Sequence, residues 1–166
     1  MRGRALLLVF TLLLMSWASA TVSLVEAPPT RETPEDGAYD VLMMGNSYTA
    51  QNSLSSRLQA LFDASGTSAS VSDLTGGGMK LYQHADNAET SGHQWRTTLT
   101  TKQYDYVILQ DQSQVPSFPT TESMWQNSKN GAIRLDSIIE DTGADTIFFM
   151  TWGYRDGDSN NAWLNP

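Results

Sequence analysis

The stretch that decides the fold runs from residue 40 to residue 49 and reads DVLMMGNSYT. Its first half is a near-continuous apolar run, which is typical of a strand covered on both faces in a parallel sheet. The next segment predicts a helix that begins after Ser53 and stops at Gly66. Its apolar residues recur at helical spacing and are Leu54, Leu58, Leu61 and Phe62. The sequence therefore indicates a strand, a short polar turn and a helix in direct succession.

Further apolar runs extend this alternation along the chain. Strands are predicted at residues 104–109 and 146–150, with another candidate at 68–75. Short apolar runs that alternate with amphipathic segments are typical of parallel strands joined by helices. We therefore expect an α/β fold, a three-layer α/β/α sandwich around a parallel sheet with right-handed crossovers.

Two more helical regions are predicted between these strands. A helix is expected from Thr121 to about Glu140, with Gly143 where a C-terminal cap belongs. Its apolar residues are Met124, Ala132, Leu135, Ile138 and Ile139. The region from 79 to 101 is expected to be helical in part. Its predicted anchors are Leu81, Trp95 and Leu99.

The N-terminus has the pattern of a secretory signal. Arg2 and Arg4 precede an apolar run, and the small residues at 18–20 follow at the spacing of a cleavage site. The run is shorter than the roughly 20 apolar residues that a spanning helix needs, so we prefer cleavage to the alternative of a membrane anchor. We divide the chain into a signal peptide at 1–20, a flexible leader at 21–38 and one folded domain at 39–166. The mature protein is then expected to be secreted or extracytoplasmic.

The charge of the chain limits its partners. The formal net charge is -8 for all 166 residues. A cleaved signal would remove Arg2 and Arg4, two positive charges, and leave -10. Nucleic acids and anionic membranes both require clustered Lys and Arg, so we expect neither as a partner.

Three polar segments follow predicted strands, at residues 45–49, 76–78 and 110–113. Ligands of parallel sheets bind beyond the carboxyl ends of the strands, so these segments should share one rim. Ser47 follows a buried strand and a Gly and precedes a helix, which would place its hydroxyl beside backbone N–H groups. A nucleophile next to an oxyanion hole needs this arrangement. The alternative is that Gly45-Asn46-Ser47 is only a polar turn that caps the helix.

The three segments together resemble the first three sequence blocks of the SGNH hydrolase superfamily, also called GDSL-like lipases and esterases. VLMMGNSYT at 41–49 is similar to the first block, in the branch that reads Gly-Asn-Ser. GGMKL at 77–81 is similar to the second block and YVILQDQS at 106–113 to the third. The resemblance implies the flavodoxin-like fold of that superfamily and covers its N-terminal part only.

The resemblance also implies roles for single residues. Ser47 would be the nucleophile, and its own N–H and that of Gly78 would be two oxyanion donors. The third donor is an Asn side chain in most of the superfamily; here Gln112 occupies its place, and Gln110 is the alternative. The candidate binding residues are Asn46, Tyr48 and His84.

The catalytic base is the main departure from the family pattern. The family takes its catalytic Asp and His from an Asp-x-x-His block near the C-terminus, and this sequence has none. We therefore interpret the chain as truncated, with both residues beyond residue 166, and expect apolar helix and strand faces to be left uncovered. His84 and His93 are the only imidazoles present, and neither is expected to act as the base. Asp111, on a polar loop, is assigned no catalytic role.

The preferred interpretation is a secreted serine esterase that cleaves carboxylic esters, for example of acetylated carbohydrate or lipid, without a cofactor or metal. One alternative is a non-catalytic extracellular protein that binds a glycan or peptide on the same fold. Another is a flavodoxin-like domain that binds a small phosphorylated ligand. The aromatic residues Trp152, Tyr154 and Trp163 either line a sugar-binding cleft or pack in the core. The oligomeric state is left open.

Overall fold

The computed structural model describes residues 34, 37–51 and 53–151. The chain divides into two units, Met1–Arg31 and Glu32–Pro166, and every described residue belongs to the second. The predicted signal peptide, most of the predicted leader and the three C-terminal aromatic residues lie outside the described residues. All described strands and helices are therefore elements of the second unit.

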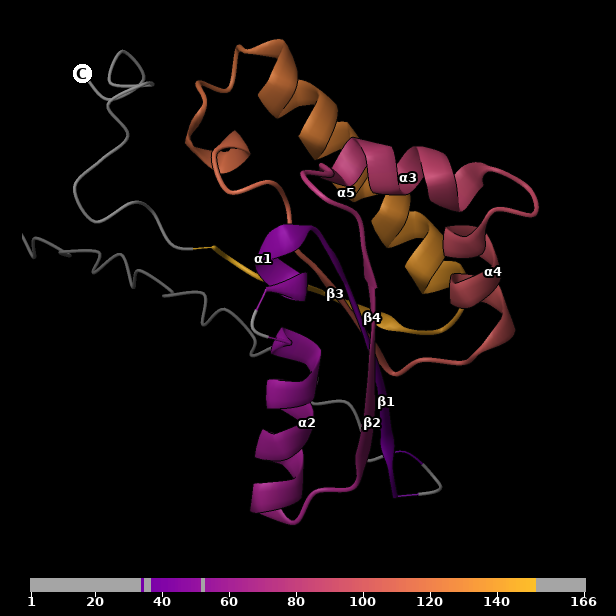
Figure 1. Ribbon diagram of the computed structural model, residues 1–166. Helices are drawn as coiled ribbons and strands as arrows, with labels where there is room; N and C mark the ends of the chain where they lie inside the picture. Colours follow the sequence, from indigo (N-terminus) through magenta and orange to yellow (C-terminus); the bar gives the residue numbers. More distant parts are fainter. Residues whose placement is uncertain (1–33, 35–36, 52, 152–166) are drawn as a thin grey trace, which may run out of the picture. The chain divides into compact units, whose positions relative to one another are not determined.

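Strands and helices alternate along this unit (Figure 1). The strands are β1 (Tyr39–Gly45), β2 (Ala69–Thr75), β3 (Tyr106–Leu109) and β4 (Asp145–Phe148). The helices are α1 (Ser47–Ala50), α2 (Leu54–Ser65), α3 (Leu81–Glu89), α4 (Gln94–Thr101), the 3-10 helix η1 (Val115–Ser117) and α5 (Ser123–Asp141). The described sheet has the order β2-β1-β3-β4, and each neighbouring pair is parallel.

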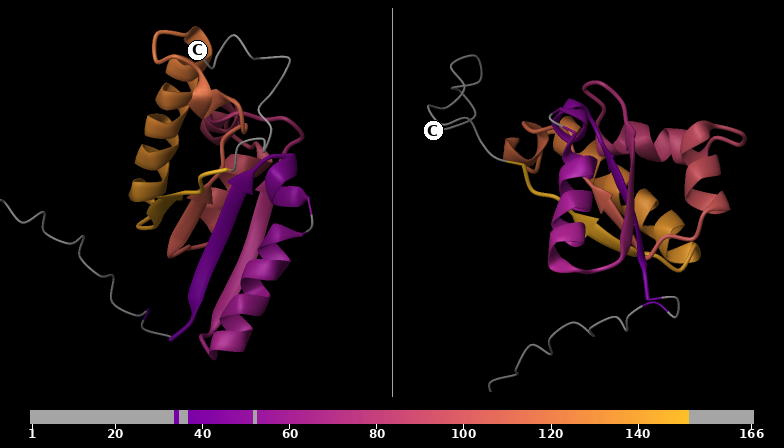
Figure 2. Two further views of the ribbon diagram at one scale, coloured as in Figure 1. Left: turned by 90° about the vertical axis from the view of Figure 1, so that its left-hand side faces the viewer. Right: turned by 60° about the horizontal axis from the view of Figure 1, so that its bottom comes forward.

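Helices cover both faces of the sheet. Helix α2 lies on one side, and α3, α4 and α5 lie on the other (Figure 2). Side chains of β1 and β3 that face the larger layer, such as Met44 and Val107, are fully buried against Leu135 and Ile139 of α5. Because alternate residues of a strand point to opposite faces, Val41 and Met43 fill the side of α2. The predicted α/β/α sandwich around a parallel sheet is confirmed.

The predicted element boundaries hold with small differences. Strand β3 begins at Tyr106 instead of residue 104, and β4 ends at Phe148 instead of residue 150. Helix α2 begins after Ser53 and ends at Gly66, as predicted, because Gly66 adopts the left-handed conformation with φ 73°. The one-turn helix α1 was not predicted, since four residues are too few to show a helical period.

Some apolar residues remain exposed. Leu61, one of the apolar residues at helical spacing, is 68% exposed because α2 meets the sheet through neighbouring positions such as the half-buried Phe62. On β4 and just after it, Ile147, Phe148 and Met150 are 42%, 58% and 89% exposed. The expectation that apolar strand faces are left uncovered is confirmed at β4.

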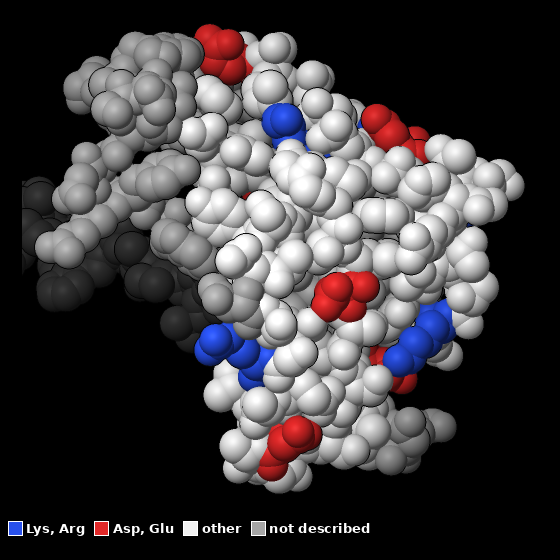
Figure 3. Space-filling model, viewed as in Figure 1, with Lys and Arg blue, Asp and Glu red and all other residues white. Residues whose placement is uncertain are grey.

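Charges on the surface are mixed. On the face shown in Figure 3, Lys and Arg appear in small separate groups, with Asp and Glu between them. Arg134 of α5 pairs with Asp86 and Glu89 of α3, and Lys102 pairs with Asp40 at 2.6 Å. These ion pairs tie neighbouring elements together.

Candidate active site

Ser47 lies where β1 passes into α1. Asn46 is the N-cap of α1, and its Oδ1 accepts a hydrogen bond from the Tyr48 backbone N–H at 3.0 Å. Ser47 is the first residue of the helix and is exposed. An N–H in the first turn of a helix has no acceptor within the helix. No residue of the described chain accepts a hydrogen bond from the Ser47 N–H.

The buried side chain of Gln110 stabilises the turn that carries Ser47. Its Oε1 accepts from the Asn46 backbone N–H at 3.0 Å and from the Thr49 hydroxyl at 2.9 Å. Gln110, Asn46 and Thr49 are each 1% exposed. Gly45 is required here because a Cβ at this position would lie 2.6 Å from Gln110 Oε1 and would also collide with the Thr49 hydroxyl. Residues on β1, α1 and the end of β3 thus form one buried polar cluster.

The glycine loop lies against the same turn. The Gly76 N–H donates to the Gly45 carbonyl at 3.1 Å, and Asn46 Nδ2 donates to the Met79 carbonyl at 2.9 Å. Gly78, between these two contacts, is exposed and has φ 66°, a left-handed conformation that favours glycine. Its N–H has no hydrogen-bond acceptor among residues 37–51 and 53–151. The first two predicted rim segments therefore lie side by side.

The two glutamines of the third rim segment make different hydrogen bonds. In Gln110 the oxygen is fixed by two donors, and Nε2 donates to the Asp111 carbonyl. In Gln112 only Oε1 is engaged, by the Gln114 N–H at 2.8 Å. Its Nε2 has no partner in the part of the chain that the structure describes, and the side chain is half-buried. Gln112, the first of the two predicted alternatives, is therefore the one with a side-chain N–H available to a ligand.

Asp111 has a structural role. Its Oδ1 accepts from the Leu81 N–H at 3.1 Å, at the start of α3, and from the Gln112 N–H at 2.7 Å. Its Oδ2 accepts from the buried Ser128 hydroxyl of α5. A carboxylate at a helix N-terminus satisfies N–H groups that lack acceptors within the helix. Asp111 thus joins the end of β3 to α3 and α5.

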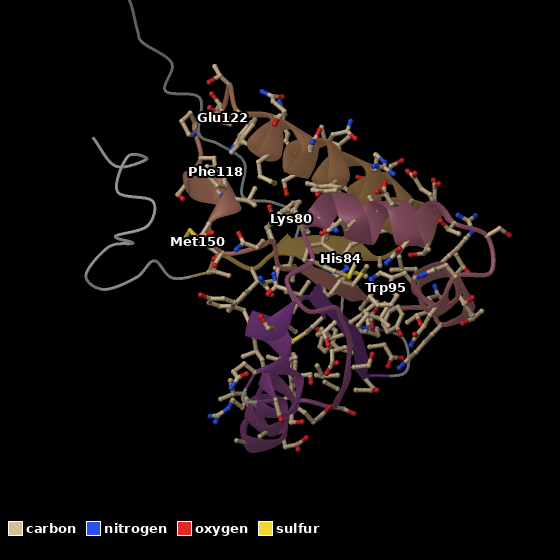
Figure 4. The ribbon with its side chains drawn as sticks, turned by 45° about the horizontal axis from the view of Figure 1, so that its top comes forward. Lys80, His84, Trp95, Phe118, Glu122 and Met150 are labelled. Atoms are coloured by element: carbon tan, nitrogen blue, oxygen red, sulfur yellow. The ribbon has the colours of Figure 1, made fainter. Side chains whose placement is uncertain are left out.

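Neither histidine contacts Ser47. His84 of α3 is 0% exposed, and its Nδ1 accepts from Trp95 Nε1 at 2.7 Å; Figure 4 shows the two side chains together. Burial lowers the pKa of His84 to about 4, and the Gly45 carbonyl opposes this shift. His93 is the N-cap of α4, and its Nδ1 accepts from the Trp95 backbone N–H at 3.2 Å. In this arrangement neither imidazole is placed to take a proton from Ser47.

The structure thus brings together the three predicted rim segments and keeps some predicted residues away from solvent. Asn46 and His84 are buried beneath the rim, whereas Tyr48 is half-buried beside Ser47. The inward position of His84 could have been read from the sequence, because it shares the i, i+3, i+4, i+7 stripe of α3. That stripe consists of Leu81, His84, Ala85 and Ala88. The supporting role of Thr49 carried no such signal.

Metal-binding and membrane-spanning features are absent from the described residues. Within them, no group of three or more His, Asp or Glu side chains is arranged to hold a metal ion. No described helix is both long and apolar enough to cross a membrane. A pocket of about 580 Å³ lies between the C-terminal ends of α4 and α5, away from the rim, and is lined by residues such as Arg96 and Asp141.

Solved structures share this architecture. A protein from Slackia heliotrinireducens, described as an inferred SGNH hydrolase, matches with a TM-score of 0.59 and 23% identity over 76% of this chain and 64% of its own. A DUF4886 family protein from Bacteroides uniformis matches with a TM-score of 0.56 and 21% identity over 77% and 55%, respectively. The chain has an SGNH hydrolase-like fold. In both cases the matched region spans less than two thirds of the solved chain. No family model and no curated protein matches the sequence.

Proposed function

We propose that the protein is a secreted serine esterase that hydrolyses carboxylic esters. One observation carries the proposal: Ser47 stands exposed at the start of α1, on a rim with three hydrogen-bond donors that have no partner in the described chain. These donors are the N–H groups of Ser47 and Gly78 and Nε2 of Gln112. Donors already in place where negative charge develops are the main requirement for stabilising a tetrahedral intermediate.

The proposed reaction follows from these groups. A base takes the proton of the Ser47 hydroxyl while Oγ attacks the ester carbonyl carbon, and the carbonyl electron pair moves onto oxygen. The three donors stabilise this oxyanion. The intermediate collapses, and the alcohol leaves with the proton returned by the base. Water then attacks the acyl group on Ser47 in the same way and releases the carboxylic acid.

The base must come from another part of the protein. His84 is buried and bonded to Trp95, and His93 caps α4. The sequence has no other histidine. The proposal therefore includes an Asp-x-x-His block beyond residue 166, as the family resemblance implies. Acetylated carbohydrates and lipids are the proposed substrate class, and the reaction requires no cofactor.

The test uses the product of the whole gene, including any reading frame that continues after the codon for Pro166. Hydrolysis of p-nitrophenyl acetate is measured for the wild type, for Ser47→Ala and for Ser56→Ala, an exposed serine of α2 that serves as the control. We expect Ser47→Ala to lose at least 100-fold in kcat/KM and the control to lose less than twofold. Equal rates for wild type and Ser47→Ala would exclude Ser47 as the nucleophile.

The position of the histidines favours one alternative, a non-catalytic extracellular protein that binds a glycan or peptide at the same rim. The same gene product distinguishes the two functions. A complete chain without an Asp-x-x-His block that binds an acetylated oligosaccharide but does not hydrolyse it supports the binding protein. Binding would then be weakened by Gln112→Ala, because Nε2 of Gln112 is an available donor at the rim.

A further inference from the structure

Strand β2 forms one edge of the described sheet, with β1 as its neighbour. The Tyr39 N–H donates to the Ser68 carbonyl at 3.0 Å, so the backbone groups of even-numbered residues in this segment face β1. Since successive residues of a strand direct their N–H and C=O groups to alternate sides, those of Ala69 and Val71 face away from the sheet. Outward N–H and C=O groups on an edge strand are a template to which another chain can add. The outer edge of β2 therefore needs either a partner or a cover.

The side chain of Gln59, on α2, covers two of these outward groups. Its Nε2 donates to the Ala69 carbonyl at 3.0 Å, and its Oε1 accepts from the Val71 N–H at 2.9 Å. In a parallel pair of strands, one residue donates its N–H to residue i of its neighbour and accepts from the N–H of residue i+2. The amide of Gln59 makes the same two hydrogen bonds. It therefore takes the place of one residue of a neighbouring parallel strand.

Asp63 fixes the orientation of this amide. It lies one turn after Gln59 on α2, and its Oδ1 accepts from Gln59 Nε2 at 2.9 Å. The amide nitrogen thus has two acceptors and the amide oxygen has one donor, so that turning the amide over would lose all three hydrogen bonds. Figure 1 and Figure 2 show α2 running beside β2, which brings this turn of the helix to the edge strand.

We infer that Gln59, oriented by Asp63, closes the β2 edge and prevents a second copy of this chain from adding a strand there. A second copy is the partner that loss of the cover would admit, because every copy carries the same edge and offers it to every other copy. The inference concerns a surface on the α2 side of the sheet and does not depend on the esterase proposal.

The first measurement is amide hydrogen exchange by NMR on a dilute solution of the whole gene product. We expect Gln59→Ala to speed exchange of the Val71 N–H at least tenfold, because this N–H loses its acceptor. Alanine is a strong helix former and Gln59 is half-buried, so the variant should retain α2. Ser55→Ala is the control, since it removes the hydrogen bond from Ser55 to Asp73 between the same two elements, and it should alter this exchange less than twofold. Unchanged Val71 exchange in Gln59→Ala overturns the inference.

The second measurement is self-association of the same variants by sedimentation velocity. We expect the dissociation constant for self-association to fall at least tenfold from wild type in Gln59→Ala and to change less than twofold in Ser55→Ala. Faster Val71 exchange without stronger association would mean that the uncovered edge admits no second copy, and it overturns the inference. An equal effect of the two substitutions also overturns it, since a loosened α2 and not the uncovered edge would then be the cause.

Discussion

The backbone N–H of Asn46 donates a hydrogen bond to Oε1 of Gln110 at 3.0 Å, although the two residues are 64 positions apart in the sequence. The bond joins the end of β1 to the end of β3, next to Ser47. The Thr49 hydroxyl donates to the same oxygen. The buried Oε1 of Gln110 therefore accepts hydrogen bonds from both ends of the first turn of α1. Neither of these donors is one of the three donors available at the rim.

Two glutamines separated by one residue should respond differently to the same substitution. Gln110→Leu leaves the Asn46 N–H and the Thr49 hydroxyl buried without an acceptor, so we expect a loss of about 3 kcal/mol in the free energy of unfolding. Gln112→Leu removes an acceptor only from the Gln114 N–H and should cost less than about 1 kcal/mol. Under the proposed esterase function, Gln112→Leu should also lower kcat by about 100-fold.

Urea unfolding followed by circular dichroism measures the first effect, and ester hydrolysis measures the second. The two variants are each other's control, because each removes one amide from the same loop. A large stability loss in Gln112→Leu with none in Gln110→Leu would contradict the assignment of the two side chains.

Gly45 and Gly78 should also differ. An added methyl at Gly45 meets Gln110 Oε1 at 2.6 Å and collides with the Thr49 hydroxyl, whereas nothing lies within 4 Å of one at Gly78. Gly78→Ala is destabilised only by its left-handed backbone, by about 1 kcal/mol. Gly45→Ala suffers both overpacking and a disturbed polar cluster, and we expect a loss of about 3 kcal/mol. Thermal unfolding of the two variants checks the order, and a larger loss in Gly78→Ala would contradict it.

The fold could be predicted from the sequence because the patterns that specify its strands and helices are local. The strand before Gly45 is an apolar run, the helix behind Ser53 has a clear period, and Gly66 stops it in the left-handed conformation. The prediction that the three polar segments share one rim followed from the rule that the carboxyl ends of parallel strands lie at one edge of the sheet. The contacts of Asn46 with Met79 and Gln110 confirm that prediction.

The details of the site could not be predicted from the sequence, because they depend on contacts between single atoms. Gln110 and Gln112 are the same residue type on the same loop, and only their partners distinguish them. His84 was predicted as a candidate binding residue, but its chemistry depends on a hydrogen bond from Trp95, eleven residues later. No pattern within one segment contains that information.

His84 should make stability depend on pH. Its pKa is about 4 in the folded protein and about 6.5 when unfolded, because burial disfavours the charged ring. Between these values the unfolded chain takes up a proton that the folded one excludes. Stability is therefore full above pH 6.5 and falls as pH decreases toward 4, by up to about 3 kcal/mol from this group.

Urea unfolding at several pH values measures this dependence. Carboxylates also titrate near pH 4, so the informative quantity is the difference between wild type and His84→Gln, which lacks the imidazole. We expect that difference to change steadily between pH 6.5 and 4 and to be constant above 7. A difference that stays constant over the whole range would mean that His84 is not buried in its neutral form.

The exposed apolar residues of β4 should make the isolated 166-residue chain associate. Ile147 and Phe148 are 42% and 58% exposed on a strand at one edge of the described sheet. Exposed apolar edge strands pair readily with other chains. We expect sedimentation velocity to show association that increases with concentration, and Ile147→Lys to reduce it strongly. Leu61→Lys, at a 68% exposed position on α2, is the control and should leave association unchanged. If both lysine variants reduce association equally, hydrophobicity in general and not pairing at β4 is the cause.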